Sequence, residues 1–454
     1  METNVIYCGD NTEVMGRYIP SNSIDLVYAD PPFFSNKSYE IIWGDGYELR
    51  AFEDRWKGGI NNYIAWMRPR LRQCHRVLKA TGSMYLHCDW HAGHYLKVLM
   101  DKIFGENNLV NNIIWKRTSA HSGSGTVRKY GAIHDSILFY AKTNDYVFDP
   151  QYVPYDEGYV EKYYRYQDED GRRWTSSDLM AKGIRHGESG KPWRGIDPNE
   201  RGNHWKFTVS KLDELAKEGR IYFPKKPGGV PRYKRYLDEM SGQLLQDIWT
   251  DITPVQAHSK ERLGYPTQKP EELLERIIKT SSNPMDVVLD PFCGCGTTLV
   301  VAHKLKRRWI GIDVSPTACK LMGNRLRKKH AEYKIVGLPR TVEELKALQP
   351  FEFQNWVFEK LHGRVNPKKI GDLGIDGWVE LDVPTQVKQS ENVGRDVVDK
   401  FETAIRRYGK KKGVIVAFSF TKGAYEEVAR VKLSDEMTKL GIKLKTVEEI
   451  LETT

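Results

Sequence analysis

Long hydrophobic runs are missing from this sequence of 454 residues. A helix that crosses a bilayer needs about 20 consecutive apolar residues, and no stretch approaches that length. The first residues, Met1-Glu2-Thr3-Asn4, also lack the pattern of a secretory signal. We therefore expect a cytoplasmic protein with no membrane-spanning segment.

Cysteine is scarce as well, and no Cys-x-x-Cys pair occurs among the six residues Cys8, Cys74, Cys88, Cys293, Cys295 and Cys319. This spacing indicates neither a disulfide framework nor a zinc site. Acidic residues are outnumbered, since 70 lysines and arginines face 60 aspartates and glutamates, for a net charge of +10. A basic chain favours a polyanionic partner because neutralised phosphates release counterions, although many basic proteins bind no nucleic acid.

The composition is that of a folded chain, with 40% hydrophobic and 29% charged residues, and the length predicts two or three domains. Apolar runs typical of buried strands alternate with stretches of helical spacing. We expect strands near residues 24–29, 83–88, 286–290 and 309–312, and a helix from Tyr63 that Thr81-Gly82 ends. This alternation predicts a doubly wound α/β sheet.

The first strand with chemical content stops at Asp30-Pro31-Pro32-Phe33. Two prolines cannot continue a strand ladder, so an acid, a stiff turn and an aromatic ring lie together at a strand's carboxyl end. Open α/β sheets bind ligands there. Taken alone, the tetrapeptide could equally be an ordinary capped turn, and the same holds for Asp10 after an earlier short strand.

A second loop, residues 290–298, connects a predicted strand to a helix and contains Gly294-Cys295-Gly296. A Gly-x-Gly loop lets a ligand approach the backbone and the free amides of the helix. Asp313, at the end of the next strand, can accept hydrogen bonds from ribose hydroxyls. Leu299 follows Thr298, so the third glycine of the dinucleotide fingerprint is missing. This favours a nucleoside ligand without pyrophosphate, such as S-adenosylmethionine, over NAD.

Together with Tyr265-Pro266-Thr267-Gln268-Lys269-Pro270, these motifs resemble those of the DNA amino-methyltransferases that act on adenine N6 or cytosine N4. The resemblance runs from about Val5 to Arg327. The catalytic motif precedes the cofactor loop, which is similar to the permuted, beta-type order. The resemblance implies methyl transfer from S-adenosylmethionine to double-stranded DNA, with a cofactor site formed by Asp10, Thr267, Lys269, Asp290, Phe292, Gly294, Gly296, Thr297 and Asp313.

The four residues Asp30, Pro31, Pro32 and Phe33 suit that reaction by their own chemistry. An exocyclic amino nitrogen is a poor nucleophile because its lone pair is delocalised into the ring. The Asp30 carboxylate and the Pro31 carbonyl can accept its two hydrogens, and Phe33 can stack on a flipped base for roughly 1–3 kcal/mol. No metal is needed for this step. Aspartate at the head of the motif, where serine is usual for cytosine N4 enzymes of this type, favours adenine N6 and leaves cytosine N4 open.

Residues 149–258 differ in composition, with tyrosines, arginines and the tryptophans Trp174, Trp193 and Trp205 between glycine-rich loops. Aromatic planes beside fixed cations suit bases and phosphates, so we interpret this region as a target-recognition insertion. The alternative is an irregular insertion whose aromatic residues form a small core of their own.

A new α/β pattern begins after Pro339, and the stretch from about Phe351 to Arg430 resembles the Mrr-type restriction endonucleases. Gln386 and Lys388 lie two residues apart on a predicted strand and therefore on one face, where Asp376 could join them. Asp376 would bind magnesium and Lys388 would orient or activate water for phosphodiester hydrolysis. Gln386 stands where an acid is commoner, so Glu359 or a backbone carbonyl would have to compensate as a ligand.

We thus predict four parts: residues 1–148 and 259–338 as the two methyltransferase halves, 149–258 as the insertion, and 350–454 as an Mrr-like nuclease domain. The predicted fold is an α/β methyltransferase sheet, doubly wound in permuted order, plus a C-terminal α/β restriction endonuclease-like domain. The predicted function is DNA methylation with a magnesium-dependent nuclease, in a restriction-modification system. The alternatives are a C-terminal domain that only binds DNA and a DNA-binding protein with two vestigial sites. The oligomeric state, a homodimer included, is left open.

Overall fold

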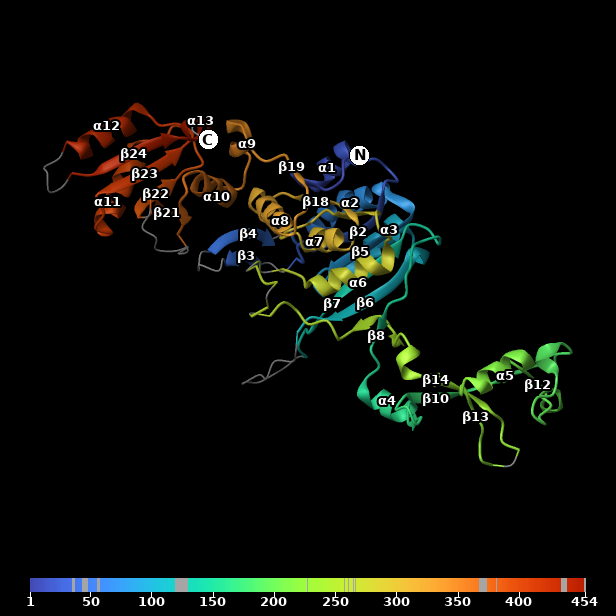
Figure 1. Ribbon diagram of the computed structural model, residues 1–454. Helices are drawn as coiled ribbons and strands as arrows, with labels where there is room; N and C mark the ends of the chain where they lie inside the picture. The colour runs from blue at the N-terminus through green and yellow to red at the C-terminus, as the bar shows by residue number, and fades with distance from the viewer. Residues whose placement is uncertain are drawn as a thin grey trace. The chain divides into compact units, whose positions relative to one another are not determined.

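The computed structural model in Figure 1 describes residues 1–34, 37–42, 48–54, 58–118, 130–226, 228–256, 258–259, 261–263, 265, 267–366, 374–380, 382–433 and 439–452. Contacts group the chain into two compact units, Met1–Asp149 with Gln246–Thr454, and Pro150–Leu245. The four-part division by sequence stays a prediction. Within the described residues, no helix combines the length and the apolar character that crossing a membrane requires.

A nine-stranded sheet forms the centre of the larger unit. Its strands follow the order β16 (Ile248–Trp249), β6 (Leu109–Lys116), β7 (His134–Ala141), β5 (Leu78–Cys88), β2 (Ile24–Ala29), β17 (Val287–Asp290), β18 (Arg308–Asp313), β1 (Val5–Cys8) and β19 (Lys334–Val336). All strands from β5 to β19 are parallel, and β7 runs antiparallel to both its neighbours. The predicted doubly wound sheet is therefore confirmed.

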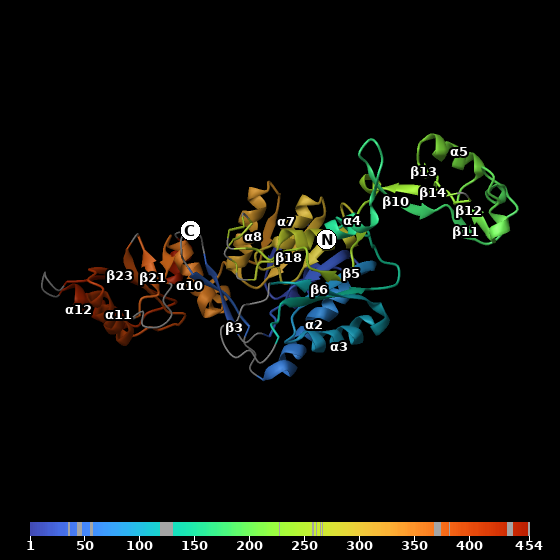
Figure 2. The ribbon, with the colours of Figure 1, turned by 90° about the horizontal axis from the view of Figure 1, so that it is seen from below.

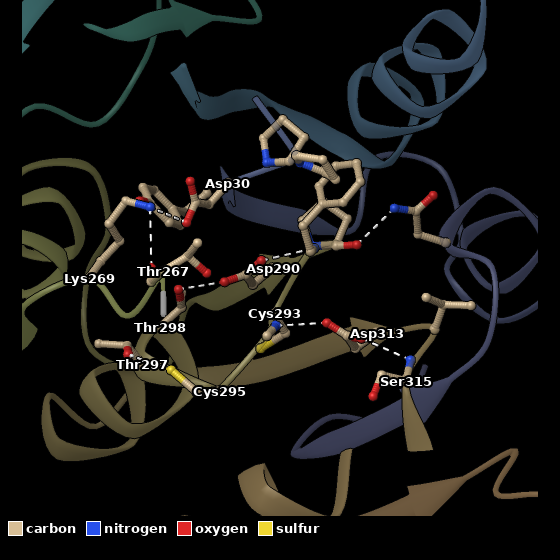
Figure 3. Close-up of a pocket in the computed structure, with 18 of the residues that line it drawn as sticks. Asp30, Thr267, Lys269, Asp290, Cys293, Cys295, Thr297, Thr298, Asp313 and Ser315 are labelled. Atoms are coloured by element: carbon tan, nitrogen blue, oxygen red, sulfur yellow. Dashed lines mark hydrogen bonds and ion pairs between the residues drawn. The ribbon is translucent and has the colours of Figure 1, made fainter. Parts of the chain in front are cut away.

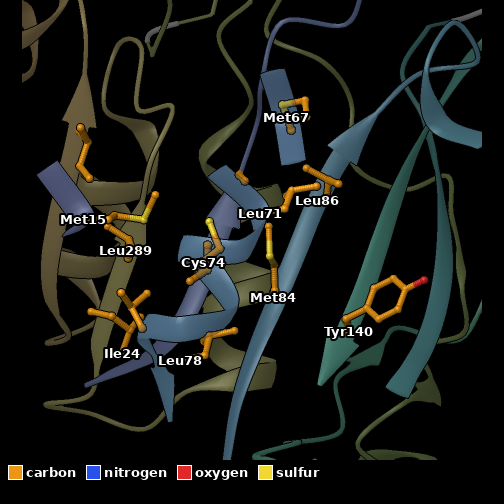
Figure 4. Packing of buried hydrophobic residues seen from close by; sticks show 14 of the residues in the cluster. Met15, Ile24, Met67, Leu71, Cys74, Leu78, Met84, Leu86, Tyr140 and Leu289 are labelled. Carbon is orange, nitrogen blue, oxygen red and sulfur yellow. The ribbon is translucent and has the colours of Figure 1, made fainter. Parts of the chain in front are cut away.

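Helices cover both faces of this sheet, as Figure 2 shows for α2 (Gly59–Val77) and α3 (Gly93–Phe104) on one side and α7 (Thr297–Lys304) and α8 (Pro316–Lys328) on the other. Helix α1 (Asn11–Tyr18) packs against α2 on the first side. Buried side chains such as Met15 and Leu71 pack there against alternate strand residues, among them Met84 and Leu289 (Figure 4).

The strand order reverses between β2 and β17. β2 leads through α2 to β5 on one side, whereas β17 leads through α7 to β18 on the other. The two strands pair in parallel, with Leu26 beside Val288 and Val27 beside Leu289. In open α/β sheets, the crevice at such a reversal is where ligands bind. The two predicted motifs, residues 30–33 and 290–298, begin at the carboxyl ends of these two strands.

The boundary between α2 and β5 differs from the prediction. We expected Thr81-Gly82 to end the helix, but α2 ends at Val77 and β5 begins at Leu78. The register with β2 shifts by three residues before Ser83, which indicates a bulge in the strand. A Cβ at Gly82 would lie 3.0 Å from the Lys79 carbonyl oxygen. The glycine that we interpreted as a helix stop thus permits a bulge inside a strand.

The C-terminal part of the larger unit has its own sheet, in the order β20 (Arg364–Val365), β21 (Gly377–Val379), β22 (Val383–Val387), β23 (Lys412–Ala417) and β24 (Gly441–Thr446). Helices α10 (Pro350–Lys360) and α13 (Val447–Glu452) share one core with Val414 and Val416 of β23. Helices α11 (Arg395–Arg407) and α12 (Lys422–Lys432) pack with Ile415 on the other face. This layered α/β domain is the one predicted.

The smaller unit contains an antiparallel sheet in the order β13 (Ile221–Tyr222), β14 (Arg232–Tyr236), β10 (Arg173–Asp178) and β9 (Tyr166–Gln167). Trp174, Trp193 and Trp205 are buried, and the last two belong to a core with Leu212 of α5 (Val209–Lys217). These tryptophans therefore stabilise the unit itself, as in the alternative interpretation. Exposed aromatic residues remain, including Tyr163.

Candidate active site

The carboxyl ends of β2 and β17 border a cavity of about 330 Å³ (Figure 3). Its wall combines the turn 30–33, the loop after β17, and Thr267 and Lys269, with Asp10 after β1 and Asp313 at the end of β18. Every methyltransferase residue predicted from the sequence lines this cavity except Gly296. Pro266, in the middle of one motif, lies outside the described residues.

Asp30 has two carboxylate oxygens in different situations. Oδ2 accepts a hydrogen bond from Lys269 Nζ at 2.5 Å. Oδ1 is buried and has no hydrogen-bond partner within the described part of the chain. Because an unsatisfied buried acceptor costs free energy, Oδ1 is a prepared site for an N–H donor from a ligand.

The ring of Phe33 contacts both a buried histidine and a cation. Lys269 Nζ is 5.1 Å from the ring centre, and the His87 ring stacks on Phe33 with a centroid distance of 5.6 Å. His87 in turn contacts Tyr28 Oη at 2.9 Å and Asp135 Oδ2 at 3.2 Å. Burial opposes the ionised form of Asp135, but the hydrogen bond from His87 and nearby cations hold its pKa below the usual range. This buried chain fixes the aromatic face that borders the cavity.

The carboxyl group of Asp290 stabilises the loop 290–298 through hydrogen bonds with residues of that loop. Its Oδ1 accepts the backbone N–H of Phe292 at 3.0 Å, and its Oδ2 accepts the Thr298 hydroxyl at 2.5 Å. Burial raises the pKa of Asp290 to about 7. Its carboxyl group is thus engaged by its own loop, although the residue also borders the cavity.

The two glycines of this loop both adopt the left-handed conformation, with φ of 52° at Gly294 and 78° at Gly296. A Cβ at Gly296 would lie 2.6 Å from Met322 Cγ, whereas one at Gly294 would meet the Tyr265 ring at 3.3 Å. Gly296 is therefore needed for the turn and its packing, and Gly294 lies at the cavity wall.

Asp313 is held by two backbone donors. Ser315 N–H donates to its Oδ1 at 2.9 Å and Gly294 N–H donates to its Oδ2 at 2.8 Å, as Figure 3 shows for the former. Burial raises the pKa of Asp313 to about 6. A carboxylate has about four lone-pair sites, so Asp313 keeps capacity for ligand hydroxyls.

Helix α2 contributes residues that sequence reasoning missed. Arg70 forms an ion pair with Asp10, and its guanidinium lies 3.8 Å from the centre of the Trp66 ring. Both residues line the cavity, as does Asn11, which donates from Nδ2 to the Pro291 carbonyl at 2.8 Å. The four-residue spacing of Trp66 and Arg70 predicts a shared helix face. Nothing in the sequence predicts that this face meets the cavity.

Asp10 combines the two interpretations given to it. It caps α1 by accepting from the backbone N–H of Thr12 at 2.8 Å and of Glu13 at 3.3 Å, and it also borders the cavity. A cap and a ligand-facing acid are thus compatible at one residue.

In the nuclease-like domain, Asp376 lies against β22, the strand that carries Gln386. Asp376 Oδ2 accepts the Val387 N–H at 2.7 Å, which fixes the carboxylate beside β22. Gln386 is 5% exposed, and its Oε1 has no hydrogen-bond partner among the described residues. An orphaned amide oxygen beside a carboxylate fits a hard cation such as magnesium.

The role predicted for Lys388 stays a prediction. Lys388 follows β22 directly and donates its backbone N–H to Val416 O at 2.8 Å. The carboxylate of Glu359 is engaged by Lys320 of α8, outside the nuclease-like domain. Residues 367–373, which precede the Asp376 turn, lie outside the described residues.

Comparisons with known proteins agree with this two-part arrangement. A family model for DNA methylases matches residues 24–324, and one for restriction endonucleases matches residues 345–452. The Type II methyltransferase M.EcaI of Enterobacter cloacae is 33% identical over 71% of this chain and 69% of its own length. The Mod subunit of the Type III restriction-modification enzyme StyLTI of Salmonella typhimurium is 27% identical over 92% of this chain and 65% of its own.

Among solved structures, a DNA modification methylase of Thermus thermophilus, TTHA0409, in complex with S-adenosyl-L-methionine is similar, with a TM-score of 0.39 and 18% identity over 74% of this chain and 99% of that one. The present chain spans about two thirds of the length of the two relatives above.

Proposed function

The chain belongs to the DNA methylase family, and we propose that the cavity between β2 and β17 is where it transfers a methyl group from S-adenosylmethionine to the N6 amino group of adenine in double-stranded DNA. One observation carries this proposal. Asp30 presents a buried oxygen without a partner among the described residues, while a lysine already holds its other oxygen. That is the acceptor an amino group needs.

The residues of the turn divide the work. Asp30 Oδ1 accepts one hydrogen of the amino group and the Pro31 carbonyl accepts the other, which releases the nitrogen lone pair from the ring. Lys269 keeps the carboxylate oriented through Oδ2. Phe33, backed by His87, stacks on the flipped base. Pro32 holds the turn rigid.

The cavity also fits the nucleoside part of S-adenosylmethionine, which supplies an electrophilic methyl group on its sulfonium. The Asp313 carboxylate would accept the ribose hydroxyls, beside the close backbone approach at Gly294. The rings of Phe292 and Trp66, 5.9 Å apart, offer apolar faces for the adenine ring. Asn11 Oδ1, buried and without a partner in the described chain, is a further acceptor.

The test uses labelled S-adenosylmethionine and DNA of mixed sequence. We expect Asp30→Asn to lose at least about 100-fold in methyl transfer, as expected for a lost electrostatic contact in the transition state. Asp25→Asn is the matched control, since Asp25 lies on β2, the strand that leads to Asp30, and binds a lysine, Lys79, outside the cavity. Full transfer by Asp30→Asn would remove Asp30 from the mechanism.

Analysis of the methylated base decides between the two targets. Adenine N6 is proposed because aspartate heads the catalytic motif, and N4-methylcytosine as the sole product would replace it by cytosine N4. Recovery of both bases would show a relaxed pocket. We also propose that residues 149–258 recognise the target sequence, between the methyltransferase halves 1–148 and 259–338.

A second activity is favoured by the orphaned oxygen of Gln386 beside Asp376. We propose that the domain from residue 350 onward cleaves DNA with magnesium, which Asp376 and Gln386 would hold while Lys388 orients or activates water. Methylation and cleavage in one chain would suit a restriction-modification system. A domain that only binds DNA is the competing proposal.

Cleavage is tested on unmethylated and methylated DNA with and without magnesium. We expect magnesium-dependent cutting that Asp376→Asn abolishes and Asp382→Asn preserves, because Asp382 is an exposed acid of the same domain paired with Lys410. Intact DNA in every methylation state would favour the binding-only domain.

A further inference from the structure

A carboxyl group from the nuclease-like domain is buried beside the proposed cofactor site. Glu352 lies in the first turn of α10 and is 4% exposed. Its Oε1 accepts the hydroxyl of Ser315, and its Oε2 accepts the hydroxyl of Thr317 at 2.9 Å. Glu352 belongs to the segment that matches restriction endonucleases, whereas both hydroxyls belong to the segment that matches DNA methylases.

This contact is unusual because no cation is paired with Glu352 within the described residues. Ser315 caps α8 and Thr317 lies in the first turn of that helix, so the carboxyl group lies where the amino ends of α8 and α10 meet. Helix amino ends favour negative charge. Burial nevertheless raises the pKa of Glu352 to about 7, so the group depends on its hydroxyl donors to remain ionised.

The hydroxyl of Ser315 connects Glu352 to the cofactor site. The same residue donates its backbone N–H to Asp313 Oδ1 at 2.9 Å, and Asp313 Oδ2 accepts from Gly294 N–H at 2.8 Å. Asp313, Val314 and Ser315 all border the cavity. A displacement of Ser315 would therefore move the carboxylate assigned to the ribose.

We propose that Glu352 is a positioning residue for the S-adenosylmethionine site, so that the nuclease-like domain must be docked on α8 for the cofactor to bind tightly. The inference rests on the proposed methyltransferase function. Through the turn 313–315, Glu352 of the nuclease-like domain would stabilise the site of the methyltransferase part. The nuclease-like domain would thereby raise the affinity of that site for S-adenosylmethionine.

The experiment measures S-adenosylmethionine binding to the full chain by calorimetry and methyl transfer under saturating cofactor. Glu352→Ala should raise Kd about tenfold while kcat at saturation changes by less than about twofold, because the residues that contact the base are untouched. Glu352→Gln, which keeps the acceptor for Ser315, should restore Kd to within about threefold of wild type.

Lys320→Ala is the matched control, since it removes the partly exposed ion pair with Glu359 across the same two helices. Such pairs contribute little, so Kd should stay within about twofold of wild type. An unchanged Kd in a folded Glu352→Ala chain would overturn the proposal. If that variant does not fold, Thr317→Val decides, and it too must weaken binding by about threefold or more.

The proposed function and this inference fail in different ways. A wild-type chain that neither binds nor uses S-adenosylmethionine contradicts the function itself. A wild-type chain that does both, with Glu352→Ala binding equally well, contradicts only the coupling. Because coupling between sites is reciprocal, S-adenosylmethionine should also slow tryptic cleavage at Arg340, which lies between β19 and the short helix α9 (Val342–Lys346), in wild type and not in Glu352→Ala.

Discussion

The methyltransferase cavity and the nuclease-like site are both built where an acid lies beside a buried strand, but they leave different atoms without partners among the described residues. In the first, the open oxygen belongs to a carboxylate whose other oxygen is bound by Lys269. In the second, it belongs to the neutral amide of Gln386, next to the Asp376 carboxylate. The first arrangement suits a hydrogen-bond donor and the second suits a cation.

The two sites also differ in how many of their polar groups are already bound by the protein itself. Around the cavity, Asp10 is paired with Arg70, and Asp290 and Asp313 each accept two donors from the protein. These contacts preorganise the cavity before any ligand enters it. The proposed nuclease site would depend more on an ion from outside, so its proposed activity should be more sensitive to single changes in the ligand set.

The largest effect that would sharpen this comparison concerns Lys269. Lys269→Met should lower kcat for methyl transfer about 100-fold, because Asp30 loses the partner that orients its carboxylate. Steady-state kinetics with labelled cofactor measures it. Lys79→Met is the control, since Lys79 binds Asp25 of β2 at 2.7 Å, outside the cavity. Equal losses in both variants would mean a general effect on β2.

The second prediction makes the nuclease-like site resemble a fully acidic one. Gln386→Glu should lower the magnesium concentration for half-maximal cleavage about tenfold, because a second negative charge joins Asp376. Gln386→Leu, with similar volume and no oxygen, should abolish cleavage. A magnesium titration that is identical in wild type and both variants would place the metal elsewhere.

The third prediction concerns stability instead of activity, through the proton on Asp290. Its folded-state pKa of about 7 lies above the unfolded value of about 3.9, so the folded state binds more protons between these values. Stability should therefore fall as pH rises through that window, and each unit corresponds to about 1.4 kcal/mol at most. Asp290→Asn should lose this dependence, because an amide does not titrate in this range. The amide can still form hydrogen bonds with Phe292 and Thr298, so the variant should fold. Parallel curves of Tm against pH would contradict this expectation.

Much of the central sheet could be predicted because its strands are continuous apolar runs that end in acids, as at Asp30, Asp290 and Asp313. The strand boundary at Leu78 could not, since the bulge at Gly82 arises from pairing with β2 rather than from local sequence. Trp205 shows the same limit: its type suits stacking on a base, and only its packing with Trp193 and Leu212 identifies it as core.

The candidate site divides in the same way. Residues in short motifs could be predicted because their types and their order along the chain indicate the chemistry that they would perform. Trp66, Arg70 and Glu352 belong to helices without such motifs, and their roles depend on which surface each helix meets. Asp290 was predicted to bind cofactor, which stays a prediction, and the hydrogen bonds that its carboxyl group accepts from its own loop could be found only from atomic positions.

The pairing of β2 with β17 also determines when the enzyme can first act. Asp30 and Lys269 are 239 residues apart, and ribosomes add about 5–20 residues per second, so the turn 30–33 is synthesised roughly 12–48 s before Lys269. During that interval β1 and β2 have been synthesised, but β17 and β18, which lie between them in the sheet, have not. Unpaired strand edges promote aggregation. A chaperone would therefore help most while only the N-terminal half of the chain has been synthesised.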